Sequence, residues 1–209
     1  MKKKEYLLID LGAVIYDINY QKTIDALSDL FDEDLYAFFS KKAQWENVDL
    51  FEEGKITGDE FCTFLKNHFN KPDVSHDSIK DAWNALLIGF REDTVIFLEE
   101  LSKTKDLYLY SNTNTFHYTE LSRRAGKVFM DRFHGCFKTV YLSHIFGHRK
   151  PHAASFTTLL EKEGLKPENG LFIDDTLHHI KGAQQAGLDI YHFKDGDRLE
   201  HVLSFCMDA

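Results

Sequence analysis

Proline, cysteine and long hydrophobic runs are all scarce in this sequence. With 3 Pro and 12 Gly in 209 residues, the chain is neither collagen-like nor of low complexity. Cys62, Cys136 and Cys206 are odd in number and lack Cys-x-x-Cys spacing, which argues against a disulfide framework or a zinc site and favours a reducing compartment. The first apolar run, at 6–9, is too short for a signal peptide or a membrane helix. We therefore expect a cytoplasmic protein with no membrane partner.

An excess of positive charge is also missing. Lys and Arg number 25 against 34 Asp and Glu, a formal net charge of −9. Such a chain repels phosphate backbones, so we expect no nucleic-acid partner. Its hydrophobic fraction of 43% and aromatic fraction of 14% are sufficient for a sizeable core. At roughly 150 residues per domain, the length predicts one large domain, or one domain that carries a smaller one.

Short apolar runs recur along the chain. Continuous runs of this kind are typical of strands that are buried on both faces of a parallel sheet. Helical patterns, two of them closed by glycine, lie between several of them. This alternation predicts an α/β core with a Rossmann-like parallel sheet. The expected strands lie at 6–9, 107–110, 139–142, 171–173 and 189–193, and the expected helices at 93–103, 152–163 and 176–186.

The stretch 17–90 differs from the rest because it contains no convincing strand. Thr57 and Glu60 have capping-box spacing, and the apolar residues that follow fall on one helical face. We interpret this stretch as a helical block inserted into the α/β core, which then comprises residues 1–16 and 91–209.

Polar residues follow four of the expected strands. Each is ordinary on its own, because Asp often ends a strand or caps a helix and Lys150 simply precedes a proline. Together they are informative, because ligands bind at the carboxyl ends of parallel strands. These residues are Asp10, Ser111 with Asn112, Lys150, and Asp174 with Asp175.

The residue types in this set suit one kind of chemistry. Converging carboxylates repel one another unless a cation lies between them, and hard oxygen ligands suit Mg²⁺. A lysine with a hydroxyl and an amide suits the oxygens of a phosphoryl group. A carboxylate can also attack phosphorus and form an acyl phosphate.

Four segments that hold these residues resemble the four motifs of the haloacid dehalogenase superfamily. They are Asp10-Leu11-Gly12-Ala13-Val14, Ser111-Asn112-Thr113-Asn114, Arg149-Lys150-Pro151 and Phe172-Ile173-Asp174-Asp175. The block at 17–90 resembles the helical cap of this superfamily, in which the loop 53–57 corresponds to one that dips toward the substrate. The chain is most similar to the branch of bacterial sugar-phosphate phosphatases typified by α-D-glucose-1-phosphate phosphatase.

The resemblance implies a role for each site residue. Asp10 is the nucleophile and a Mg²⁺ ligand, and the Gly12 carbonyl is a second ligand. Asp175 binds the metal directly, and Asp174 binds it directly or through water. Ser111 and Asn112 hold the phosphoryl group, and Lys150 neutralises it.

Gly12 departs from the superfamily pattern, in which most phosphatases place a general acid at this position. One interpretation is a good leaving group, such as the anomeric oxygen of a hexose 1-phosphate. The other is a weak or inactive phosphate-ligand binding protein, and Asp17 or a histidine from the cap could also replace the acid. We expect a Mg²⁺-dependent phosphatase that acts on a small phosphorylated substrate through an aspartyl-phosphate, as a monomer or homodimer. His178 and His179 are interpreted as exposed helix residues.

Overall fold

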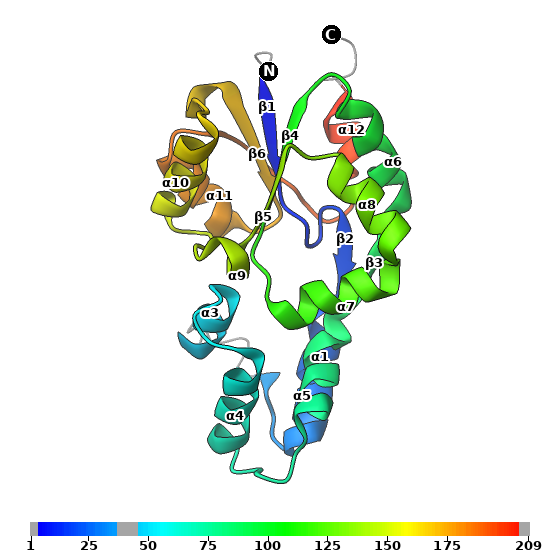
Figure 1. The fold of residues 1–209 in the computed structure, drawn as a ribbon, viewed down its shortest axis with the longest axis vertical. Helices are drawn as coiled ribbons and strands as arrows, with labels where there is room; N and C mark the ends of the chain where they lie inside the picture. Colours follow the sequence, from blue (N-terminus) through cyan, green and yellow to red (C-terminus); the bar gives the residue numbers. More distant parts are fainter. Residues whose placement is uncertain (1–3, 37–45, 205–209) are drawn as a thin grey trace.

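A parallel five-stranded sheet forms the centre of the molecule in the computed structural model, which describes residues 4–36 and 46–204. The strand order is β5-β4-β1-β6-β7, and helices cover both faces (Figure 1). All five strands were predicted from their apolar runs, so the α/β class is confirmed. The strands are β1 (Tyr6–Ile9), β4 (Asp106–Ser111), β5 (Thr139–Leu142), β6 (Gly170–Asp174) and β7 (Asp189–His192).

Strand β1 lies in the middle of the sheet and sets the position of Asp10. Ile9 pairs with Leu109 of β4 and with Ile173 of β6. The carboxyl ends of these three neighbouring strands therefore meet at one edge of the sheet. The backbone N–H of Asp10 still donates to the Ile173 carbonyl at 3.0 Å, which fixes the start of the loop after β1.

Alternate residues of β1 contribute to two hydrophobic cores. Leu7 and Ile9 face one core, and Leu8 faces the other. This arrangement explains why the run is continuously apolar, because both faces of the strand are buried. The helices of the α/β part are α6 (Glu92–Leu101), α7 (Thr115–Ala125), α8 (Lys127–Gly135), α9 (Ser143–Phe146), α10 (Ala153–Glu163), α11 (Leu177–Gln185) and α12 (Leu199–Val202), with a 3₁₀ turn, η2, at Pro167–Asn169.

A helical insertion follows β1 and has a hydrophobic core of its own. Buried residues such as Phe31, Phe61 and Trp83 form this core, and the insertion lies beyond the carboxyl edge of the sheet (Figure 1). The predicted capping box is confirmed, because the Thr57 N–H donates to the Glu60 carboxylate at 2.7 Å. The insertion comprises α1 (Tyr20–Phe31), α3 (Glu46–Glu52), α4 (Gly58–His68), α5 (His76–Trp83) and the 3₁₀ turn η1 (Asn84–Leu86).

The expectation that 17–90 contains no strand was wrong. Strands β2 (Tyr16–Ile18) and β3 (Leu87–Phe90) form an antiparallel ribbon at the two ends of the helical insertion. Tyr16 pairs with Phe90, so the two partners are far apart in the sequence and no local pattern joins them. The boundaries 1–16, 17–90 and 91–209 remain a proposal.

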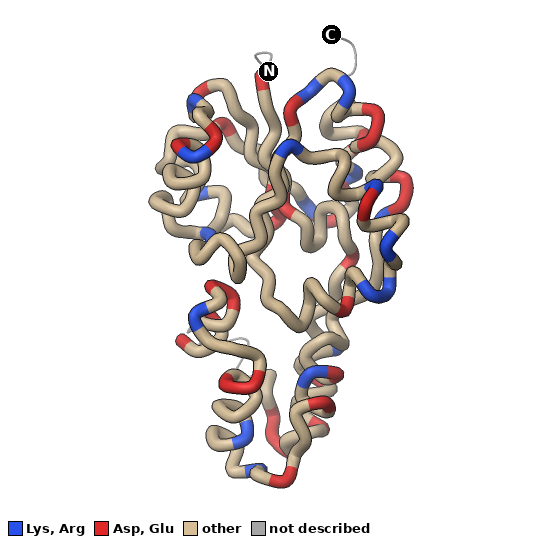
Figure 2. The backbone as a smooth tube through the Cα atoms, in the orientation of Figure 1, with Lys and Arg blue, Asp and Glu red and all other residues tan. Residues whose placement is uncertain are grey.

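Two of the cysteines, Cys62 and Cys136, are buried and free, and Cys206 lies outside the described residues. Within the described residues, no helix is both long and apolar enough to cross a membrane. Lys and Arg alternate with Asp and Glu over both parts of the molecule (Figure 2).

Candidate active site

Three carboxylates converge at the carboxyl edge of the sheet. Ligand atoms of Asp10, Asp174 and Asp175 all lie within 4.8 Å of one another. Asp10 and Asp175 line a cavity of about 250 Å³ between the sheet edge and the helical insertion. The fold therefore brings together acids that are separated by more than 160 residues in the sequence.

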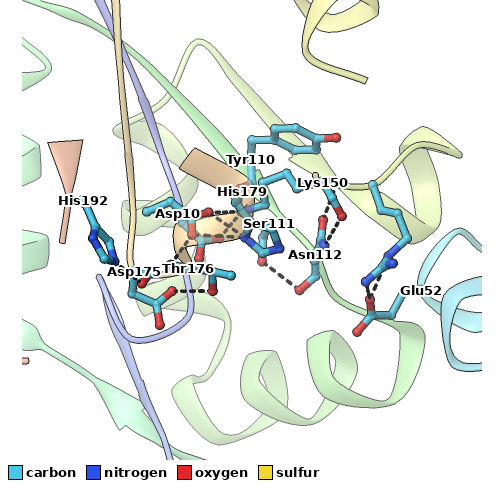
Figure 3. A network of polar contacts seen from close by, with 12 residues as sticks. Asp10, Glu52, Tyr110, Ser111, Asn112, Lys150, Asp175, Thr176, His179 and His192 are labelled. Atoms are coloured by element: carbon cyan, nitrogen blue, oxygen red, sulfur yellow. Dashed lines mark hydrogen bonds and ion pairs between the residues drawn. The ribbon is translucent and has the colours of Figure 1, made fainter. Parts of the chain in front are cut away.

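Lys150 lies between two of these acids (Figure 3). Its Nζ donates to Asp10 Oδ1 and to Asp174 Oδ2, both at 2.7 Å, and to the Tyr110 carbonyl at 2.9 Å. The side chain is fully buried, so an ammonium there needs these partners. Burial lowers the pKa of Lys150, but Asp10 and Asp174 raise it further, and the net shift is upward.

The loop that holds Lys150 is fixed by contacts from two other elements. Lys150 N donates to Asn112 Oδ1, and Asn112 Nδ2 donates to the Lys150 carbonyl, both at 2.9 Å. On α11, Gly182 lies so close that an added Cβ would stand 1.8 Å from the Pro151 carbonyl oxygen. Asn112, which was expected to hold a phosphoryl group, lines the cavity, and its side chain braces the lysine loop.

The two acids after β6 have different surroundings. Asp174 is fully buried, and in addition to Lys150 it accepts from Thr176 N at 2.7 Å and contacts His179 Nδ1 at 3.0 Å. Asp175 is only half-buried, and its side chain accepts a long hydrogen bond from Thr176 Oγ1 at 3.3 Å. Asp175 is thus free to bind a cation, whereas Asp174 is occupied by donors.

His179 is one functional residue that the sequence interpretation missed. It was expected to be an exposed helix residue, and His178 is exposed, but His179 is half-buried, lines the cavity and contacts Asp174. Its position five residues after Asp174, within the first turn of α11, was the available signal.

The acids together carry more negative charge than Lys150 balances. Burial raises the pKa of Asp10 to about 8, with Lys150 opposing and Asp174 adding to the shift. Burial also raises the pKa of Asp175, as does the charge of Asp174. For Asp174, burial is outweighed by Lys150 and His179, and its pKa is about 2. Asp10 Oδ2 has no hydrogen bond within the described residues, so the set fits a divalent cation beside Asp10 and Asp175.

Ser111 and Gly12 complete the core side of the cavity. Ser111 is buried, and its hydroxyl donates over a long distance of 3.4 Å to the Asn112 carbonyl. Gly12 lines the cavity without a side chain. Asp17, considered as a replacement acid, pairs with Arg91 at 2.7 Å and is not among the residues that line the cavity.

The cavity also has walls that sequence reasoning did not identify. Tyr20 and Glu52 reach it from the helical insertion, and His117 reaches it from α7. No described histidine of the helical insertion lines it. The loop 53–57 does not line it either; this loop rests on α9, where a Cβ on Gly54 would stand 2.1 Å from the His144 carbonyl oxygen.

Together, the parallel sheet and the acids at its carboxyl edge define an α/β protein with a carboxylate cluster where its central strands end. The chain matches the haloacid dehalogenase-like hydrolases over residues 10–187, and it belongs to this family. The resemblance in the four motifs is thereby confirmed at the level of the family.

Similar proteins span almost the whole chain. The D-ribitol-5-phosphate phosphatase of Bacteroides thetaiotaomicron is 29% identical over 97% of this chain and 98% of its own. A haloacid dehalogenase family enzyme from the same organism, in complex with magnesium, has a TM-score of 0.84 at 28% identity, covering 97% of this chain and 99% of that one. A mutant of that enzyme with magnesium and inorganic phosphate has a TM-score of 0.86 at 27% identity, covering 96% and 98%.

Proposed function

We propose that this protein is a Mg²⁺-dependent phosphatase that hydrolyses a small phosphomonoester through an aspartyl-phosphate on Asp10. One observation carries the proposal: an Asp10 oxygen without a hydrogen bond stands in the cavity, beside Asp175 and beside the ammonium of Lys150. The magnesium complexes of the similar enzyme support the choice of cation.

The residues of the chain can perform the reaction in two steps. In the first, Asp10 Oδ2 attacks phosphorus, the bond from phosphorus to the ester oxygen breaks, and the leaving oxygen takes a proton. In the second, water attacks phosphorus and loses a proton to solvent, the bond from phosphorus to Asp10 Oδ2 breaks, and inorganic phosphate leaves with the Asp10 carboxylate restored. Lys150 holds the other Asp10 oxygen in place, and the Ser111 hydroxyl faces the same cavity as a donor to the phosphoryl oxygens.

Mg²⁺ would be held by Asp10, Asp175 and the Gly12 carbonyl, and when bound it supplies positive charge against the phosphoryl oxygens. Asp174 is better suited to orient Lys150 and to act on the ion through water, because both of its oxygens already accept hydrogen bonds. The helical insertion serves as the cap, which covers the cavity and excludes bulk water.

The substrate we propose is a sugar phosphate or a sugar-alcohol phosphate. The relative that acts on D-ribitol 5-phosphate supports this class, and hexose 1-phosphates belong to it. A cavity of about 250 Å³ suits a small polyhydroxylated chain better than a nucleotide or a protein.

Phosphate release from a panel of phosphomonoesters tests the proposal. We expect turnover of sugar or polyol phosphates that requires Mg²⁺ and is abolished in Asp10→Asn. Ligand binding that depends on metal but releases no phosphate would overturn it, and would favour the inactive binding protein suggested by the absence of an acid at Gly12.

A further inference from the structure

Glu52 is the acidic group that the helical insertion presents to the cavity. It is the last residue of α3, and it lines the cavity that also contains Asp10 (Figure 3). One of its oxygens, Oε2, accepts from Arg149 Nη2 at 2.8 Å and from Arg149 Nε at 3.1 Å. The other oxygen, Oε1, accepts no hydrogen bond within the described residues, so it is available to a ligand.

Arg149 fixes the direction of this carboxylate. Its side chain is only 3% exposed, and its third nitrogen, Nη1, lies 2.8 Å from Asp49 Oδ1, one turn earlier on α3. A guanidinium is planar and rigid, so contacts to two acids hold it in one orientation. Arg149 directly precedes Lys150 in the sequence. Its ion pair with Glu52 therefore links the helical insertion to the loop that holds Lys150.

A second contact holds α3 against the core. Gly54, just after the helix, has a φ of +67° and packs against the His144 carbonyl so closely that no Cβ fits. Glu52 is therefore held between two fixed points of the core, the Arg149 side chain and the backbone of α9. A carboxylate positioned this firmly can select by geometry as well as by charge.

The chemistry of the free oxygen defines what it can recognise. An ionised carboxylate only accepts hydrogen bonds, so its partner must carry an O–H or N–H. A hydroxyl on the carbon chain of the substrate supplies such a donor, whereas a second phosphate or a carboxylate would be repelled. The cavity thus favours a neutral polyol chain attached to a single phosphoryl group.

We propose that Glu52 determines specificity by accepting a hydrogen bond from a substrate hydroxyl, and that Arg149 is the residue that positions it. This inference rests on the proposed phosphatase function, and it identifies a hydroxyl of the substrate as the group that the helical insertion recognises. Asp49 provides the matched control, because it also pairs with Arg149 but does not line the cavity.

The test compares Glu52→Leu with Asp49→Leu on two substrates, ribitol 5-phosphate and ethyl phosphate, which has no hydroxyl. Each variant removes an acidic partner of Arg149, and the comparison on ethyl phosphate shows how far a looser insertion differs between the two. We expect Glu52→Leu to lower kcat/KM for ribitol 5-phosphate by about 10- to 100-fold more than Asp49→Leu does, the range of a lost hydrogen bond to a charged group. The extra loss should be mainly in KM, and on ethyl phosphate the two variants should be alike.

Glu52→Gln, which keeps the shape of the side chain, serves if the leucine variants fold poorly. It should lower the preference for ribitol 5-phosphate over ethyl phosphate and should weaken the exclusion of a sugar bisphosphate. The inference about Glu52 would be overturned if the wild-type protein hydrolysed both substrates and Glu52→Leu or Glu52→Gln kept its preference for ribitol 5-phosphate over ethyl phosphate. The proposed function would stand in that case. Failure of the wild-type protein to release phosphate from these two substrates and from the whole panel of phosphomonoesters would instead overturn the proposed function.

Discussion

At the scale of single residues, Lys150 determines the charge balance of the site. It is the ammonium that contacts both Asp10 and Asp174, and it is fully buried among them. Removing one partner from a buried ion pair leaves the others without compensation, which costs about 3–5 kcal/mol. We therefore expect both catalysis and folding to depend on this side chain.

We expect Lys150→Ala to lower kcat/KM by several orders of magnitude, because the variant lacks the main positive charge that faces the phosphoryl group. Its free energy of unfolding should fall as well, as measured by urea denaturation. Lys127→Ala, a change at an exposed lysine of α8, is the control. Near-normal activity in Lys150→Ala would show that the lysine has been assigned the wrong role.

His117 gives the molecule a predictable response to acid. Burial lowers the pKa of this histidine from 6.5 to about 3, and its Nδ1 contacts Asn84 Oδ1 at 3.0 Å. Between these two pH values the unfolded chain binds a proton that the folded protein does not. Stability is therefore intact above pH 6.5 and decreases as the pH falls toward 3, by up to about 1.4 kcal/mol per pH unit.

Unfolding free energies at pH 7.5 and pH 5 test this expectation. His117→Gln should reduce the loss of stability between the two values, and His178→Gln, a change at an exposed histidine of α11, should leave it as in the wild type. An equal loss in the His117 variant and the wild type would contradict the buried neutral state of His117.

The sequence predicted some residues of the site better than others. Asp10, Ser111, Asp174 and Asp175 directly follow or end buried strands, and parallel strands necessarily bring their carboxyl ends together. Glu52 gave no such signal, because it ends a short helix whose approach to the sheet depends on tertiary packing around Arg149. Tyr20 and His117 were missed for the same reason.

At the scale of elements, glycines set how closely helices and loops approach the site. A helical glycine is normally destabilising, and its replacement by alanine normally stabilises by about 0.5–1 kcal/mol. Gly182 is an exception, because α11 packs directly against the Pro151 carbonyl next to Lys150.

We expect Gly182→Ala to lower both the free energy of unfolding and kcat/KM, because the added methyl group must displace the lysine loop. Gly135→Ala is the matched control: it lies in α8, and an added Cβ there meets nothing within 4 Å. This variant should have unchanged or slightly raised stability. If Gly182→Ala and Gly135→Ala changed stability and activity equally, the close packing of α11 against the Pro151 carbonyl would have no effect on either property.

Gly54 holds the helical insertion against the core. Gly54 and Gly164 both have a positive φ, of +67° and +68°. An added Cβ at Gly164 would meet nothing within 4 Å. Gly54→Ala and Gly164→Ala therefore carry similar backbone strain, but only the first clashes with the His144 carbonyl. We expect a fall in kcat/KM confined to Gly54→Ala, measured beside the stability of both variants; equal activity in the two would contradict a role for this contact in closing the cavity.

The elements of the sheet could be predicted because burial on both faces makes their sequences uniformly apolar. Strands β2 and β3 could not, because each has three or four residues and their pairing joins residues 16–18 to residues 87–90. Helices α7 and α8 were also missed: the helical patterns found in the sequence did not extend to 115–135. Local patterns therefore defined the layers of the fold but not the connection between its two parts.

At the scale of the whole molecule, the site needs a second cation. Burial, together with the charges of Asp174 and Asp175, raises the pKa of Asp10 to about 8 against the opposing charge of Lys150, so the protonated form of this carboxyl is favoured when no metal is bound. A divalent ion favours the ionised form, and its binding is therefore coupled to proton release.

We expect Mg²⁺ binding at pH 7 to release up to about one proton and to tighten as the pH rises through 8. Calorimetry in buffers with different ionisation enthalpies measures this release. Asp175→Asn should weaken Mg²⁺ binding, and an exposed-site variant such as Asp131→Asn should not. Binding without any proton release at pH 7 would mean that the metal does not meet the Asp10 carboxyl.

The most direct test of the central claim is a crystal structure of the protein with Mg²⁺ and fluoroberyllate, a mimic of the transferred phosphoryl group. The account predicts beryllium bonded to an Asp10 oxygen, with the cation in contact with Asp10 and Asp175 and Lys150 facing the fluorides. Fluoroberyllate bonded elsewhere, or a cation remote from Asp10, would contradict it.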